Sequence, residues 1–350
     1  MTANTSTRAT ATPLIHGMAL AALAFTACGG GATAPLPASS VVVTVSEQAD
    51  PADLRPTSEW SSPINLGPEI NSTSNDQGPV ISRDELSIYF ASTRPGGFGG
   101  NDLWVSRRAH KTDPWGPALN LGATINTSAV ESTPFLSRDG LRLYFASARP
   151  GGVGGIDLWV SERADRTDDL GWGEPVNLGP AINSAAADLG PAFFRDRETE
   201  RVTMYFYSTR PGGPGLRDIY RSTVDEAGSF TPAVLVAELS TPFEDEQPSV
   251  RRDGLEVFFA SNRPGSMSTI VTDIWVARRA HASDSWSEPE NLGPVINTAG
   301  LEARPALSFD GRRLYFFSDG HGGFGATDLL VTSRDLPERT SVPAEHPPQP

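Results

Sequence analysis

Lysine and cysteine are nearly absent from this chain of 350 residues. Lys111 is the single lysine and Cys28 the single cysteine, so no Cys/His cluster is available to hold a metal ion. Acidic residues outnumber basic ones, and the formal net charge is −14. An acidic surface disfavours nucleic acid and anionic lipid headgroups as partners. We therefore expect no nucleic-acid partner.

The familiar catalytic patterns are also missing. The chain has no Gly-x-Ser-x-Gly, no His-Glu-x-x-His and no Asp-x-Asp-x-Asp-Gly calcium loop. The glycine-rich stretch at 96–100 joins two expected strands and does not open a helix, so it is not a phosphate-binding loop. The sequence consequently assigns no catalytic residue, no cofactor and no metal site.

No long amphipathic helix is visible, and the chain is instead built from one stretch that occurs five times. Each copy ends in a triplet such as Asp-Leu-Trp, whose aspartates are Asp102, Asp157, Asp218, Asp273 and Asp328. Short runs of Val, Ile, Tyr, Phe and Trp alternate in each copy with Gly, Pro, Asp and Ser, which is typical of strands joined by tight turns. Four strands in each of several repeats predict the blades of a β-propeller.

A further motif indicates how the ring closes. Trp115, followed by Asn120-Leu121-Gly122, marks a fourth strand that recurs in later units and also precedes the first unit, as Trp60 with Asn65-Leu66-Gly67. The motif is missing after the last unit. We therefore predict an all-β fold over 59–334: a five-bladed β-propeller with four antiparallel strands per blade, closed by the N-terminal strand.

The two ends of the chain carry other expectations. Residues 1–27 have the pattern of an export signal, with an apolar stretch before small residues and Cys28. Phe25-Thr26-Ala27-Cys28 resembles a bacterial lipobox, which predicts lipidation of Cys28. Residues 28–58 and the Pro-rich tail 335–350 are expected to be disordered. The predicted location is the cell envelope, with a lipid anchor in the outer membrane, facing the periplasm or the cell surface.

The repeat resembles a known family. The pattern from Pro134 to Trp159, with Ser-x-Asp-Gly, Leu-Tyr-Phe and Arg-Pro-Gly-Gly, is similar to the WD40-like β-propeller repeat of TolB-type periplasmic proteins. The resemblance covers about 60–334. It implies an envelope scaffold or binding protein with a protein or cell-wall partner and without a fixed catalytic set.

One set of charged residues repeats with the blades. An acid stands three residues before the Pro of each innermost strand, and an arginine follows each second strand except the last. Because these two connections share one face of a propeller, acid and arginine should meet at the rim of the central channel. The candidate ligand-binding acids are Asp76, Glu131, Asp188, Asp245 and Glu302. The candidate arginines are Arg94, Arg149, Arg210 and Arg263. A ring of structural ion pairs is the favoured reading of the set.

The fifth blade departs from this pattern. Gly320 replaces the arginine, between Asp319 and His321, and leaves Glu302 without its expected partner. If this face binds a polar ligand or a metal ion, the fifth blade is the expected place, and Asp319 and His321 are therefore added to the candidate ligand-binding residues.

Three functions are compatible with these features. The first is a non-enzymatic, lipid-anchored envelope protein whose propeller face binds a protein or cell-wall partner. The second is a five-bladed glycoside hydrolase, which needs two or three carboxylates at the central depression. The third is a lectin with one weak site per blade. We take the first as the leading expectation, because a catalytic acid and base need different environments while the candidate acids are repeated.

Overall fold

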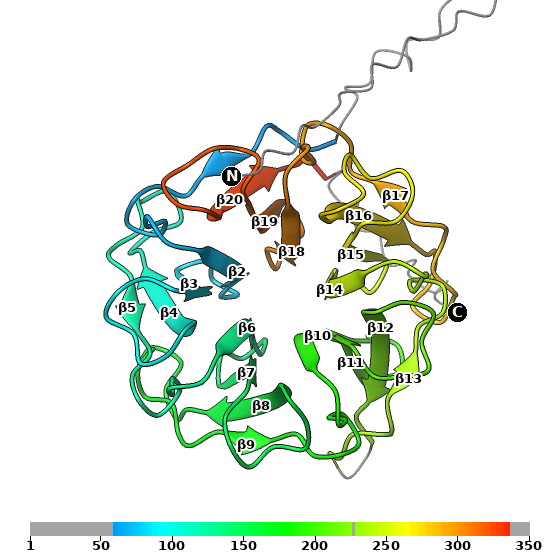
Figure 1. The fold of residues 1–350 in the computed structure, drawn as a ribbon, viewed down its shortest axis with the longest axis horizontal. Helices are drawn as coiled ribbons and strands as arrows, with labels where there is room; N and C mark the ends of the chain where they lie inside the picture. The colour runs from blue at the N-terminus through cyan, green and yellow to red at the C-terminus, as the bar shows by residue number, and fades with distance from the viewer. Residues whose placement is uncertain (1–58, 226–227, 337–350) are drawn as a thin grey trace, which may run out of the picture. The chain divides into compact units, whose positions relative to one another are not determined.

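Five four-stranded antiparallel sheets surround a central axis in the computed structural model, which describes residues 59–225 and 228–336 (Figure 1). The prediction of an all-β, five-bladed propeller is confirmed. Within these residues no helix is found, and accordingly none that is long and apolar enough to cross a membrane. The proposed signal segment, Cys28, the linker to Ser58 and the tail from 337 lie outside the described residues.

Each blade runs outward from the axis. The innermost strands are β2 (Asp76–Ile81), β6 (Glu131–Leu136), β10 (Asp188–Arg195), β14 (Asp245–Val250) and β18 (Glu302–Leu307). The second strands are β3 (Ser87–Ser92), β7 (Arg142–Ser147), β11 (Val202–Ser208), β15 (Glu256–Ser261) and β19 (Arg313–Ser318). The third strands are β4 (Asp102–Arg107), β8 (Asp157–Glu162), β12 (Asp218–Thr223), β16 (Asp273–Arg278) and β20 (Asp328–Ser333). The short outer strands are β1 (Ile64–Asn65), β5 (Leu119–Asn120), β9 (Val176–Asn177), β13 (Val234–Leu235) and β17 (Glu290–Asn291).

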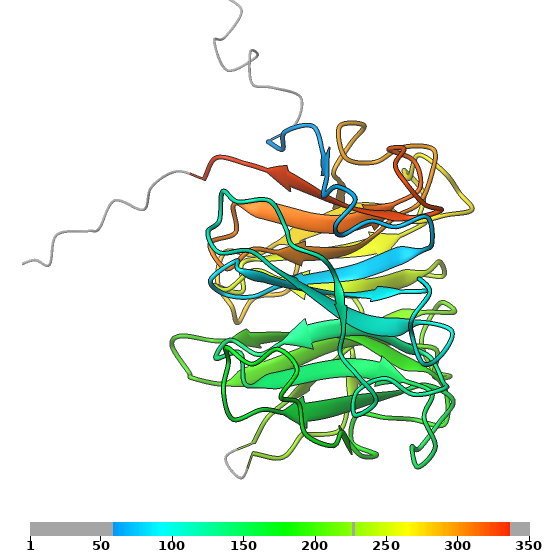
Figure 2. The same cartoon turned by 90° about the vertical axis from the view of Figure 1, so that its left-hand side faces the viewer.

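The strands run from one face of the ring to the other, so their ends lie on these two faces (Figure 2). We call one the loop face: it carries the connections into the innermost strands and those from second to third strands. The other is the turn face, which carries the hairpin turns between innermost and second strands.

The core lies between neighbouring blades and is built mainly from the second strands. Their central residues are aromatic and fully buried, namely Phe90, Phe145, Phe206, Phe259 and Phe316. Burying one such ring stabilises the fold by roughly 1.5–3 kcal/mol. Each of these five rings lies in a different hydrophobic cluster of the described residues.

The N-terminal strand closes the ring as predicted. β1 pairs with β20, placing Ile64 opposite Val331, so the fifth sheet joins both ends of the propeller. The guanidinium of Arg334 stacks 4.5 Å from the ring of Trp60. Arg108 and Trp115 of the first blade repeat this contact at 4.2 Å.

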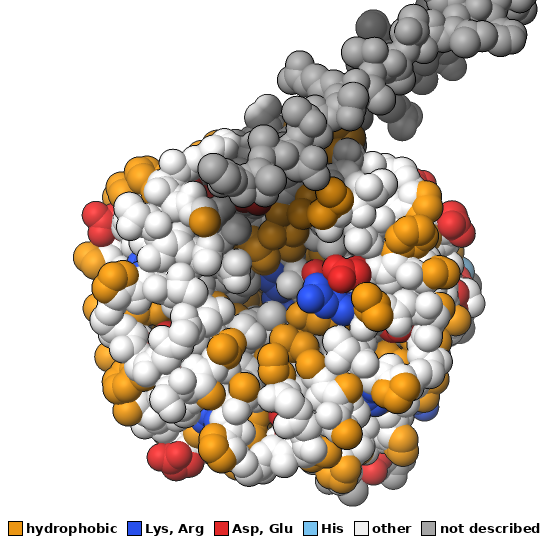
Figure 3. Space-filling model, viewed as in Figure 1, with side chains coloured by type: hydrophobic (Ala, Val, Ile, Leu, Met, Phe, Trp, Pro, Cys, Tyr) orange, Lys and Arg blue, Asp and Glu red, His pale blue; other side chains and the backbone are white. Residues whose placement is uncertain are grey.

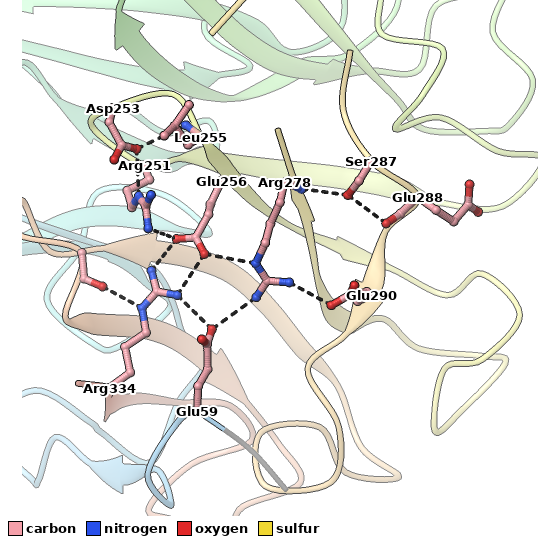
Figure 4. Close-up of polar contacts among 11 residues, drawn as sticks. Glu59, Arg251, Asp253, Leu255, Glu256, Arg278, Ser287, Glu288, Glu290 and Arg334 are labelled. Atoms are coloured by element: carbon pink, nitrogen blue, oxygen red, sulfur yellow. Dashed lines mark hydrogen bonds and ion pairs between the residues drawn. The ribbon is translucent and has the colours of Figure 1, made fainter. Parts of the chain in front are cut away.

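A charged network strengthens the closure (Figure 4). Arg334, whose side chain is fully buried, contacts Glu59 at 2.9 Å and Glu256 at 2.5 Å. Arg251 and Arg278 approach the same Glu256 at 2.6 and 3.3 Å. Burial opposes ionisation of Glu256, but its contacts with Arg334 and the other two arginines leave its pKa lowered. The network links β15 to the segments before β1 and after β20.

The glycine-rich loops are ordered by the aspartate that begins each third strand. Asp157 accepts hydrogen bonds from the backbone N–H groups of Val153 and Gly154, the second at 3.0 Å. Gly154 cannot be replaced without movement, because a Cβ there would lie 2.1 Å from the carbonyl oxygen of Ser184 in the next loop. The loop is thus held on both sides.

Candidate functional site

The repeated acids and arginines form ion pairs in four blades. All four acids are fully buried, and Arg94–Asp76, Arg210–Asp188 and Arg263–Asp245 each measure 2.6 Å while Arg149–Glu131 measures 3.4 Å. Asp76, Glu131 and Asp245 also accept a hydrogen bond from the serine that ends the second strand, as Asp76 does from Ser92 at 2.6 Å. This geometry gives the pairs a structural role within each blade. Ligand binding by them stays a prediction.

In the fifth blade a histidine takes the arginine's place. His321 Nε2 donates to the carbonyl oxygen of Ile296 at 2.8 Å, a carbonyl equivalent to those that the arginines contact in the other blades. It also lies 3.8 Å from Glu302. Glu302 is fully buried and accepts hydrogen bonds from Thr298 at 2.7 and 2.8 Å and from Ser318 at 2.8 Å. Burial nevertheless raises its pKa, although these hydrogen bonds oppose the shift.

The two neighbours of Gly320 hold the loop rather than reach outward. Asp319 accepts a hydrogen bond from the backbone N–H of Leu301 at 2.7 Å. A Cβ at Gly320 would lie 1.8 Å from Thr298 Oγ1, so the arginine of the other blades could not be placed here without movement of the loop. Binding of a ligand at Asp319 and His321 also stays a prediction.

A different set of residues lines the channel. The third residue of every innermost strand has a positive φ and sits at a shift in strand register, and these residues are Gly78, Thr133, Gly190, Gln247 and Arg304. Thr133, Gln247 and Arg304 adopt φ values of 47°, 56° and 52° without being glycine. Such conformations cost about 1–3 kcal/mol each and gather at functional sites. The strain therefore marks the channel as a candidate site.

Arg304 crosses the channel at this level. Its Nη2 donates to the carbonyl oxygens of Thr133 and Pro134 in the second blade, at 3.2 and 2.8 Å. Its backbone N–H donates to Gln247 Oε1 at 2.7 Å. The residue is 4% exposed, and burial lowers its pKa to about 10. Arg304 thus links three blades and separates the channel into a loop-face part and a turn-face part.

On the loop-face side two glutamates share one arginine. Arg217 Nη1 lies 2.9 Å from Glu246 and 3.3 Å from Glu244, at the start of β14. Figure 3 shows acidic and basic side chains together at the edge of the central hollow, over this strand. Glu246 is buried and Glu244 is partly exposed.

Burial is the largest cause of the shifted pKa of Glu246. It raises the pKa of this carboxyl to about 7, against the positive charge of Arg217 and with the help of the negative charge of Glu244. Burial strongly raises the pKa of the Tyr207 hydroxyl, and the negative charge of Glu246 raises it further. The side chain of Gln247 lies beside Tyr207, which therefore connects the glutamates to the strained residues. The cluster is a candidate acid–base site.

Sequence reasoning missed this cluster because it does not repeat. The position of Glu246 is occupied in the other blades by the uncharged residues Gln77, Ser132, Leu189 and Ala303. A single charged residue at a position that is uncharged in every other blade could have indicated the site. Within residues 59–225 and 228–336 no group of three or more His, Cys, Asp and Glu side chains could hold a metal ion.

Comparisons with known proteins show which solved structures have a similar fold. No family model and no curated protein matches the sequence. Among solved structures, an α-L-arabinofuranosidase from Lactobacillus brevis has a TM-score of 0.55 at 14% identity, over 77% of this chain and 92% of the other. An arabinanase from Bacillus subtilis has a TM-score of 0.50 at 13% identity, over 77% and 96%. A TolB-type protein from Agrobacterium tumefaciens has a TM-score of 0.42 at 16% identity, over 78% and 83%.

The two matches with TM-scores of 0.50 and above support the propeller fold, and they correct one expectation. A non-enzymatic scaffold was the leading interpretation of the sequence, but the similar folds with TM-scores of 0.50 and above that are named here belong to glycoside hydrolases. The physical argument behind that expectation was that the repeated acids share one environment. It does not apply to Glu246, which is a single acid outside the repeated set. Envelope location, the lipid anchor and a protein or cell-wall partner stay predictions.

Proposed function

We propose that this propeller is a glycoside hydrolase with its catalytic site at the loop-face mouth of the channel. The observation that carries the proposal is the buried Glu246, whose pKa is raised to about 7 beside a second, more exposed carboxylate. Glycoside hydrolysis needs such a pair, in which one carboxyl is protonated near neutral pH and the other is ionised. The different burial of Glu246 and Glu244 provides this difference.

Glu246 is assigned the role of general acid. At neutral pH a substantial fraction of this carboxyl carries a proton, which it would deliver to the oxygen of the departing sugar. Glu244 is assigned the second role at the anomeric carbon, and its partial exposure lets substrate reach it. Arg217 lies between them and fixes both carboxylates.

The spacing of the two glutamates bears on the stereochemistry. Both oxygens contact the same Arg217 nitrogen, so their separation cannot exceed the sum of 2.9 and 3.3 Å. Inverting enzymes hold their carboxyl groups roughly 6.5–9.5 Å apart and retaining enzymes about 5–5.5 Å apart. This limit on the two oxygens is closer to the retaining range, and on this basis we propose Glu244 as the nucleophile.

The fold relationship supports the same substrate class. The matched proteins are described as an arabinofuranosidase and an arabinanase, and this chain covers more than nine-tenths of each. A further similar structure, with a TM-score of 0.50, is described as a β-xylosidase/α-arabinofuranosidase. Polysaccharides that contain arabinose or xylose are therefore the first substrates to test. The comparison supplies this choice, and the carboxylate pair supplies the chemistry.

The test is a turnover assay on purified propeller. The substrates are 4-nitrophenyl arabinosides and xylosides, together with arabinan and xylan. On arabinan and xylan we expect hydrolysis that falls by at least about 100-fold in Glu246→Gln, as loss of a general acid implies, and a smaller fall on the 4-nitrophenyl glycosides, whose departing group needs little protonation. Glu162→Gln is the matched control, because Glu162 is an exposed glutamate paired with Arg142 away from the channel mouth. Sugar binding without turnover on the same panel would replace hydrolysis with lectin function.

A further inference from the structure

A second site lies at the opposite end of the channel. A cavity of about 910 Å³ opens among the hairpin turns of the turn face, on the far side of Arg304 from Glu246. Its walls combine arginines with apolar side chains, which include Val80, Phe135, Phe193 and Leu307. No residue assigned to hydrolysis above lines it, so the proposal that follows is independent of the proposed function.

The floor of the cavity is a buried cation. Arg304 lines it, and no carboxylate of the described residues lies within 4.0 Å of its guanidinium. Its Nη2 donates hydrogen bonds to the carbonyl oxygens of Thr133 and Pro134. Its Nε and Nη1 make no hydrogen bond within the described part of the chain. A buried cation without a paired anion is costly, and a bound anion would offset that cost.

Cations also surround the mouth. Arg83, Arg138 and Arg252 come from three different blades and stack on the ring of Phe309 in the fifth, at 4.6, 5.3 and 4.5 Å from its centroid. All three arginines are exposed and line the cavity. Arg83 and Arg138 form no ion pair with any described residue. Three like charges around one ring repel one another, and an anion between them would relieve that repulsion.

The acids of the same turns make contacts within their own turns. Asp84 and Asp310 each accept from the serine of their own turn, at 2.6 Å. Asp139 does the same with Ser137 at 2.5 Å, and Asp253 pairs with Arg251 at 2.8 Å. The residues that line the cavity include seven arginines and two acids, Asp139 and Glu200, so the lining carries an excess of positive charge in a protein of net charge −14.

We propose that this cavity binds an organic anion that consists of a carboxylate on an apolar body. The planar guanidinium of Arg304 can receive a carboxylate through its remaining N–H groups. The apolar walls would bury the rest of the ligand, and the three rim arginines would attract it and shield its charge. An inorganic phosphate would make no use of the apolar side chains, and a neutral sugar would leave the guanidinium of Arg304 without an anion.

The test is isothermal titration calorimetry of the whole protein with octanoate, and with octan-1-ol and inorganic phosphate as separate probes. Octanoate should bind more tightly than either of the other two, and its affinity should fall as salt is raised. Arg304→Met should weaken octanoate by at least about tenfold, as loss of a charge-assisted hydrogen bond implies, and should leave octan-1-ol unchanged. Arg221→Gln is the control, because Arg221 is exposed and does not line the cavity.

A second variant keeps the proposal testable if Arg304→Met does not fold. Arg83→Gln combined with Arg138→Gln changes only exposed side chains, and we expect octanoate to bind several-fold more weakly with a smaller salt dependence. Equal affinities for octanoate and octan-1-ol in the unsubstituted protein would overturn the proposal. So would unchanged octanoate binding in the rim variant, or phosphate binding as tight as that of octanoate.

Discussion

At the scale of single residues, Glu246 should give the protein an unusual dependence of stability on pH. Its pKa in the folded state, about 7, is above the ordinary value of a glutamate. The folded state therefore penalises the charged form, and this penalty is fully present above about pH 7 and vanishes below the unfolded pKa of about 4.3. Stability from this one group rises as the pH falls through that window.

Replacing Glu246 with glutamine removes this dependence. Relative to the parent, Glu246→Gln should gain free energy of unfolding on going from pH 5 to pH 8, by an amount on the order of 2–3 kcal/mol. Urea denaturation of both proteins at the two pH values measures it. A difference that is the same at both values would show that the carboxyl titrates normally.

The two kinds of blade acid should also differ in stability. Asp245→Asn leaves the buried Arg263 without a charged partner and should cost about 3 kcal/mol. Glu302→Gln leaves no arginine behind, since Glu302 is held by Thr298 and Ser318, and should cost about 1 kcal/mol. Chemical denaturation at pH 7 ranks them, and the reverse order would contradict this account of the pairs.

The repeat explains which of these residues could be predicted. Asp245 and Arg263 recur in equivalent places of other blades, so spacing and strand direction were enough to place them together. Glu246 and Arg304 each occur once, and their contacts reach across to other blades. Gln247 joins them through a bulge that sequence spacing does not show. The contacts of residues that depart from the repeat could therefore not be predicted from the sequence.

At the scale of elements, two adjacent glycines in one loop should respond differently to a methyl group. A Cβ at Gly154 would lie 2.1 Å from Ser184 O and 2.4 Å from Ala186 O, while nothing lies within 4 Å of one at Gly155. Gly154→Ala should cost about 1–3 kcal/mol by overpacking. Gly155→Ala should be neutral or slightly stabilising. Thermal melts of the pair measure it, and equal midpoints would mean that the loop moves freely aside.

The strands themselves were predictable because each blade offers the same alternation of aromatic runs and turns. The bulge in every innermost strand was not, since only Gly78 and Gly190 supply a glycine there and the other three blades adopt the same φ with Thr133, Gln247 and Arg304. Tertiary packing around the channel overrides the local preference of these residues. The positive φ of these residues shapes the channel lining, on which both proposed sites depend.

At the scale of the whole molecule, closure should control stability. A chain that begins at Pro56 keeps β1, Trp60 and Glu59, whereas one that begins at Pro68 exposes the edge of β20 and leaves Arg334 without its ring and one of its carboxylates. We expect the shorter chain to lose several kcal/mol of unfolding free energy and to aggregate. Equal thermal midpoints for the two chains would contradict closure by the N-terminal strand.

The pH profile of glycoside hydrolysis tests the central claim most directly. For an alkyl arabinoside, whose departing oxygen needs a proton, kcat/KM of the parent should fall above about pH 7 as Glu246 loses its proton. Glu246→Gln should abolish that alkaline limb and most of the rate, yet retain more activity on a 4-nitrophenyl arabinoside, whose departing group needs little protonation. An unchanged profile in the variant, or no hydrolysis of either substrate by the parent, would contradict the assignment of Glu246 as the catalytic acid.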